Sequence, residues 1–154
     1  MRPFFEEEAA RQTPAWSRDG QRLSFSLIEA DEEAQIWVVD DDGSGLHPLT
    51  SGFRDLAATR SPDGASIAFR RESVALGSEI FVMDSDRSDP RNLTNHPALD
   101  LNPVWSPDGR WIAFNSDREA RNSVWVVGLD GSEPLEVSTG FVWADVVGWA
   151  PTPP

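Results

Sequence analysis

Residues 103–114, with the sequence PVWSPDGRWIAF, decide the fold, because the tetrapeptide at their centre recurs along the chain. Ser-Pro-Asp-Gly stands at 61–64 and 106–109, a near copy stands at 17–20, and a decayed copy begins at Trp149. The positions before the serine are 44, 45 and 44 residues apart, at Trp16, Arg60, Trp105 and Trp149. Self-similarity at a fixed period of this length is the signature of an array of supersecondary units.

More than the tetrapeptide recurs. Apolar segments follow it in three copies, at 23–25, 67–69 and 112–114, and again at 36–39, 80–83 and 124–127. An aspartate precedes each new cycle, at Asp55, Asp100 and Asp145. Agreement at this many positions makes chance a poor explanation, so the chain is interpreted as one unit repeated three times.

The apolar segments have the composition of short strands. They are rich in Val, Ile, Phe and Trp, and they are bounded by Gly, Pro, Asp or Ser. The 3.6-residue periodicity of an amphipathic helix is missing. Pro-Asp-Gly favours a tight turn, because Pro presets φ, Asp bonds its own backbone and Gly accepts positive φ. Strands are predicted at 13–16, 22–26, 35–39, 46–49, 56–59, 66–70, 79–83, 90–93, 102–105, 111–115, 123–127 and 134–137.

Four strands in each cycle match the blade of a β-propeller. The predicted fold is an all-β propeller of three four-stranded antiparallel blades plus one extra innermost strand. The blades span 13–55, 56–100 and 101–144, the extra strand spans 145–150, and the flanks are a lead-in at 1–12 and a tail at 151–154. A β-sandwich is the structural alternative, although it would not require such regular repetition. A closed ring needs roughly four to eight blades, so we expect either part of a longer propeller or two copies that complete six blades.

A family resemblance rests on the run 103–118, extended by 80–84 and 91–94. This run resembles the repeat of TolB-like β-propellers, which also occurs in the propellers of prolyl-oligopeptidase-type peptidases. The resemblance covers about residues 13–150, and it implies a periplasmic, six-bladed propeller. Arg60 stands where the repeat has Trp, and Arg18 stands where it has Pro. A shared fold does not by itself imply a shared activity.

Charge and composition exclude several classes of function. With 26 acidic and 13 basic residues the net charge is −13, whereas binding to a phosphate backbone needs clustered basic residues. Nucleic acid is therefore not an expected partner. No run of 18 apolar residues is present to span a membrane. The first eight residues lack the apolar core of a secretion signal. The compartment stays open: periplasmic by resemblance, cytoplasmic if Met1 is the natural start.

Catalytic chemistry is not expected of this chain. It has no cysteine, two histidines (His47 and His96) and no Gly-x-Ser-x-Gly elbow, so neither a nucleophilic triad nor a histidine-rich metal site is predicted. The acidic run 40–45 superficially suggests a calcium loop, but its spacing is not that of an EF-hand, and a hairpin turn explains it. The prediction is a non-enzyme without cofactor or metal.

The candidate partner-binding residues are those near the predicted connections between blades: Asp55, Asp100, Asp145, Arg54, Arg60 and His96. Each aspartate precedes an innermost strand, and in a propeller such connections gather at one mouth of the channel. One interpretation is structural, in which the aspartate caps its loop or pairs with an arginine such as Arg118. The other is an acidic rim that binds a peptide. Arg54, Arg60 and His96 are candidates because they differ from the repeat pattern in the same region, and function is often found at such departures.

The function predicted from these features is non-catalytic binding of a protein or peptide at the loop-lined face. The alternative is the propeller portion of a prolyl-oligopeptidase-type serine peptidase, which would gate substrate access to a separate hydrolase domain. A blade set that is purely structural is a third possibility.

Overall fold

The fold is known from a computed structural model that describes residues 10–28, 33–73, 77–86, 90–137 and 149. The described residues form β-strands in three groups of four. Blade 1 consists of β1 (Ala10–Trp16), β2 (Arg22–Ile28), β3 (Ala34–Asp40) and β4 (His47–Pro48). Blade 2 consists of β5 (Arg54–Arg60), β6 (Ser66–Ser73), β7 (Gly77–Asp84) and β8 (Arg91–Asn92). Blade 3 consists of β9 (Asp100–Trp105), β10 (Trp111–Ser116), β11 (Ser123–Gly128) and β12 (Leu135–Glu136).

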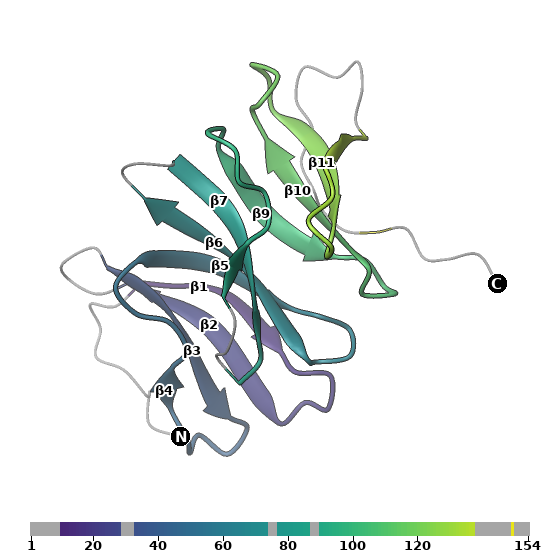
Figure 1. Cartoon of the computed structure of the whole chain (residues 1–154). Coiled ribbons are helices and arrows are strands. Elements are labelled where there is room, and N and C mark those ends of the chain that lie inside the picture. The colour runs from purple at the N-terminus through teal and green to yellow at the C-terminus, as the bar shows by residue number, and fades with distance from the viewer. Residues whose placement is uncertain (1–9, 29–32, 74–76, 87–89, 138–148, 150–154) are drawn as a thin grey trace.

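Within each blade, neighbouring strands pair antiparallel in sequence order. The three sheets fan out around the innermost strands β1, β5 and β9 (Figure 1). One parallel bridge joins Ala34 of blade 1 to Arg54 of blade 2, and Ser78 and Leu99 form the corresponding bridge between blades 2 and 3. The predicted all-β propeller fold is confirmed, as an open arc of blades within the described chain. Of the predicted extra strand at 145–150, the structure describes only Trp149.

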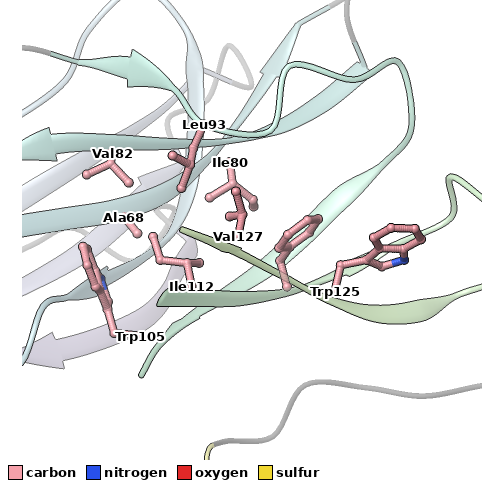
Figure 2. Packing of buried hydrophobic residues seen from close by; sticks show 9 residues of the cluster. Ala68, Ile80, Val82, Leu93, Trp105, Ile112, Trp125 and Val127 are labelled. Atoms are coloured by element: carbon pink, nitrogen blue, oxygen red, sulfur yellow. The ribbon is translucent and has the colours of Figure 1, made fainter. Parts of the chain in front are cut away.

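The apolar core lies between the blades. Ala68, Ile80 and Val82 of blade 2 face Ile112, Phe114 and Val127 of blade 3, as Figure 2 shows for the labelled members. A second cluster joins blade 1 to blade 2 through Ile36, Val38, Ala58, Ile67, Phe69 and Met83. Because successive side chains of a strand point to opposite faces, β6 sends Ile67 and Phe69 toward blade 1 and Ala68 toward blade 3. The middle blade is therefore buried on both faces.

The Ser-Pro-Asp-Gly turn has the same hydrogen bonds in all three copies. In blade 3, the Ser106 hydroxyl donates to Asp108 Oδ1 at 2.6 Å and accepts from the Trp111 N–H at 3.0 Å. Asp108 Oδ1 also accepts from the Arg110 N–H at 3.1 Å, and the Gly109 N–H donates to the Ser106 carbonyl at 2.9 Å. The other two copies repeat this pattern from Ser17 and Ser61. The serine hydroxyl thus bonds both the aspartate of the turn and the first backbone N–H of the next strand, which explains why serine recurs here.

A tryptophan that recurs before the turn serine bonds to the backbone of the preceding blade. The Trp105 indole N–H donates to the Thr59 carbonyl at 3.1 Å, and the Trp149 indole N–H donates to the Val104 carbonyl at 3.2 Å. Thr59 and Val104 each precede the corresponding position of their own blade. Trp16 belongs to the same series but is 57% exposed, because the described chain contains no blade before blade 1. In blade 2 the equivalent position is occupied by Arg60 instead of tryptophan.

One repeated feature of the innermost strands is not predicted by the sequence. The pairing of β5 with β6 shifts register between Leu56 and Thr59, and that of β9 with β10 shifts at the equivalent place. Ala57 and Asn102, at the two shifts, have φ of 54°. Positive φ is uncommon outside glycine, and such bulges bend a strand and increase its twist. Here they curve the strands that line the axis.

Two smaller expectations can be compared with the structure. The acidic run after β3 is a hairpin turn, in which the Asp40 N–H donates to the Ser44 carbonyl at 3.0 Å and the Ser44 N–H donates to Asp42 Oδ1 at 2.8 Å. The outermost strands are shorter than predicted, with two residues each. Within the ranges given above, no helix has the length and apolar character needed to cross a membrane.

We predict that Ser106→Ala lowers the free energy of unfolding by about 1–2 kcal/mol, because two hydrogen bonds of a buried hydroxyl are lost. Urea denaturation followed by tryptophan fluorescence measures the change. Ser132→Ala, at an exposed serine of an outer turn, is the control and should stay within about 0.5 kcal/mol of the parent. Equal effects of the two substitutions would contradict the role assigned to Ser106.

A pH dependence follows from the same turns. The serine hydroxyl, and then a backbone N–H, lower the pKa of the Asp63 and Asp108 carboxyls below the ordinary 3.8. The carboxyls of Asp63 and Asp108 therefore bind protons more readily in the unfolded chain than in the folded one. Their contribution to the free energy of unfolding is complete above pH 3.8 and is lost as the pH falls through the folded pKa. We expect NMR titration to show the pKa of Asp108 rising toward 3.8 in Ser106→Ala. An unchanged pKa in that variant would contradict the assignment.

Candidate functional site

The connections that lead from one blade to the next lie at the end of the sheets opposite the Ser-Pro-Asp-Gly turns. We call the surface formed by residues 50–54 and 93–99, together with the β6–β7 end of blade 2, the connection face. Strand β5 runs from Arg54 at this face to Arg60 near the turns. Its seven residues separate the two ends by about 20 Å.

A groove of about 470 Å³ opens on the connection face between blades 2 and 3. Its lining residues are Arg54, Glu72, Ser73, Gly77, Ser78, Leu99 and Leu101. Leu99 is 48% exposed and supplies an apolar wall. At the rim, Glu72 accepts from Arg54 and from Arg70, each at 2.7 Å. The groove is within the size range of small-molecule and side-chain pockets, and it offers an apolar surface beside paired charges.

Asp55 lies beneath this face and forms a buried ion pair. Its carboxylate is completely buried and accepts from Arg71 Nε at 2.7 Å and Nη2 at 2.8 Å. The guanidinium lies over aromatic rings, 4.1 Å from the centroid of Phe53 and 4.7 Å from that of Phe81. Phe53 is 48% exposed, so it covers the pair at the surface. The bidentate geometry fixes the start of β5 to β6.

Asp100 forms the corresponding pair in blade 3. Its buried carboxylate accepts from Arg118 Nη2 at 2.9 Å, while Arg118 Nε donates to Ser116 Oγ at 3.0 Å. Arg118 lies 4.8 Å from the Trp125 ring centroid and 5.3 Å from that of Phe114. Blades 2 and 3 therefore each bury an aspartate–arginine pair beneath the connection face, with aromatic rings packed against the arginine. The two arginines come from different positions of the repeat.

The connection before β9 is held by Glu79, which sequence reasoning missed. This carboxylate is 3% exposed, accepts from Thr94 Oγ1 at 2.7 Å, and accepts from the His96 N–H at 3.0 and 3.1 Å. His96 Nδ1 in turn accepts from the Ala98 N–H at 3.1 Å. Blades 1 and 3 have Gln35 and Ser123 at the position of Glu79, so this position does not repeat and only the charge of Glu79 distinguishes it in the sequence.

The structure brings together only part of the predicted residue set. Arg54 lines the groove, His96 lies in the connection that leads to Leu99, and Asp55 and Asp100 are buried below. Arg60 lies at the far end of β5, away from the connection face. Asp145 falls outside the described residues. The arginine predicted as a partner of these aspartates, Arg118, does pair with Asp100, whereas Arg71 was missed because its contact depends on strand register.

Comparisons with known proteins give a consistent picture. The family model described as the TolB beta propeller domain matches residues 56–149, more than half of the chain. The chain is 38% identical over 139 residues to the uncharacterized protein Atu1656 of Agrobacterium fabrum, covering 89% of this chain and 45% of that protein. It is 32% identical over 122 residues to the Tol-Pal system protein TolB of Bordetella pertussis, covering 79% and 28%.

Two further matches come from other proteins. The uncharacterized peptidase YuxL of Bacillus subtilis is 27% identical over 133 residues, which cover 80% of this chain and 20% of that protein. The crystal structure of TolB from Acinetobacter baumannii superposes with a TM-score of 0.78 at 22% identity, over 91% of this chain and 35% of that one. The chain thus spans less than half the length of each of these proteins. By its repeats, its blades and the matching family model, it belongs to the TolB β-propeller family.

Proposed function

We propose that this propeller is a non-catalytic module that binds a protein or peptide at its connection face. The observation that carries the proposal is the groove between blades 2 and 3, where the exposed Leu99 lies beside the Arg54–Glu72 pair. An apolar side chain of the partner would enter against Leu99 and Leu101. Arg54 and Glu72 would meet the polar atoms around it. Compact apolar anchors with a polar rim are typical of binding sites on proteins.

Rigidity supports the same proposal. Binding is weakened by the entropy of ordering the loops that make contact. Here the start of β5 is fixed by Asp55 and Arg71, and the connection before β9 is fixed by Glu79. The groove is therefore formed before the partner arrives, and little ordering is needed on binding.

The residues predicted for partner binding take different roles in this proposal. Arg54 contacts the partner directly, and His96 lies in the connection that carries Leu99 toward it. Asp55 and Asp100 act as positioning residues through their arginines. Asp145 stays a prediction from its repeat position. The similarity to a protein named as a Tol-Pal system component is consistent with a partner-binding role.

The second candidate is the propeller portion of a serine peptidase, in which the blades gate access to a separate hydrolase domain. The similarity to the peptidase YuxL favours it, because the matched segment makes up only 20% of that protein. An α/β-hydrolase segment encoded in the same reading frame would favour this candidate. Binding of peptides by the isolated propeller at the groove would favour the first.

We predict that peptides selected from a random display library on this chain bind at least about tenfold more weakly to Leu99→Ser, because the apolar wall is lost. Fluorescence polarisation with the selected peptides measures affinity. Leu135→Ser is the matched control, because Leu135 is 61% exposed on the outermost strand of blade 3. Peptides that bind Leu99→Ser as tightly as the parent would contradict the proposed site, and so would a selection without binders.

We predict that Asp100→Asn lowers the free energy of unfolding by about 3 kcal/mol, because it leaves the buried Arg118 without its counter-charge. Removing both charges in Asp100→Asn/Arg118→Met should restore part of this loss, which denaturant unfolding of the variants measures. If the changes in the free energy of unfolding caused by Asp100→Asn and Arg118→Met simply add in the double variant, the two side chains do not interact as described. Unchanged stability in Asp100→Asn would also contradict the positioning role assigned to this buried residue.

A further inference from the structure

A second cleft lies at the opposite end of the sheets, between the Ser-Pro-Asp-Gly turns of blades 1 and 2. We call it the turn cleft; its volume is about 630 Å³. Its lining includes Arg18, Asp19 and Arg22 from blade 1, and Arg60, Asp63 and Ser85 from blade 2. Three of the 13 basic residues of this acidic chain therefore meet in one place. The predicted partner site at the connection face does not use this cleft.

Arg60 is the unusual member of this cleft. It stands where Trp105 and Trp149 stand in their own cycles, and those residues donate to a carbonyl of the preceding blade. Arg60 Nε is buried and has no hydrogen-bond partner within the described part of the chain. A guanidinium is a pure donor with five N–H groups, and a buried donor without an acceptor is destabilising. Arg60 also lines the turn cleft, so its guanidinium faces a space that an acceptor supplied by a ligand could enter.

The neighbouring charges leave Arg60 poorly compensated. Burial, and next the charge of Arg22, lower the pKa of the Arg60 guanidinium, while Asp19 acts in the opposite direction. Asp19 and Asp63 already accept hydrogen bonds from the serine and a backbone N–H of their own turns.

The two other arginines have weak partners of their own. Arg22 is 3.3 Å from Asp40 across exposed side chains, and Arg18 Nη1 donates to the Pro62 carbonyl at 3.4 Å. A ligand that places negative charge between Arg22 and Arg60 would relieve their mutual repulsion.

We propose that the turn cleft binds a phosphate group, either free or as the monoester of a small molecule, between Arg60 of blade 2 and Arg18 and Arg22 of blade 1. A carboxylate can also accept from two guanidiniums, but its two oxygens lie in one plane and carry a single charge. A tetrahedral phosphate presents acceptor oxygens toward both blades at once and carries up to two charges. The cleft is larger than a phosphate ion, so an organic substituent has room beside it.

The test is calorimetric titration of the chain with inorganic phosphate and with glycerol phosphate at constant ionic strength. We expect saturable binding at one site, weakened at least about tenfold in Arg60→Trp, because a charge-assisted hydrogen bond is lost. Arg60→Trp introduces the residue that the repeat carries at this position, so the fold should be kept, and circular dichroism checks this. Tighter binding of glycerol phosphate would identify a monoester as the ligand, and equal binding would identify free phosphate.

Two further variants separate the cleft from general charge effects. Arg22→Gln, at an exposed position, should also weaken phosphate binding. Arg110→Ala removes a charge from the equivalent turn of blade 3, which is not part of the cleft, and should leave binding unchanged. Retained binding in Arg60→Trp, an equal loss in Arg110→Ala, no saturable binding by the parent, or equally tight binding of succinate would each overturn the proposal.

Discussion

Burial of both faces of a sheet is the constraint on which this structure depends. Strand β6 is apolar on two sides, with Ile67 and Phe69 facing blade 1 and Ala68 facing blade 3. Ile67, Ala68 and Phe69 are all completely buried. A sheet of this kind is stable only between two others, because the area removed from water scales with the surface covered. Repetition of one sheet unit about an axis meets this requirement for blade 2, which lies between blades 1 and 3.

The parts of the fold that could be predicted are those determined within one repeat. Turn residues mark where strands begin, and the serine of each turn bonds its own aspartate and the next strand. The parts that could not be predicted depend on pairing between strands. Asparagine tolerates positive φ, but Ala57 carries no such signal at the equivalent position, so the sequence does not show the bulge that gives both Ala57 and Asn102 their positive φ. Arg71 reaches Asp55 only because register places the two residues opposite each other.

The same distinction applies to the candidate site. The aspartates were visible as a repeat, and the structure buries two of them beneath the surface rather than at it. The apolar part of the groove comes from Leu99, directly before β9, and Leu101, the second residue of β9, and neither leucine stands out in the sequence. Its existence depends on how the connection 93–99 leaves blade 2, and that path is held by Glu79, at a position where the other two blades have Gln35 and Ser123.

Arg60 and Arg54 show how one strand can serve two surfaces. Both belong to β5, yet the strand separates its ends by about 20 Å. Between them lie Leu56 and Ala58, which are both buried, and Ala58 belongs to the cluster between blades 1 and 2. A packed core resists continuous deformation, so a ligand at one end should not displace the other end. Energetic effects at sites this far apart and without shared partners usually add. If both proposals hold, ligands at the two faces should therefore bind independently, one at an apolar groove and the other between arginines.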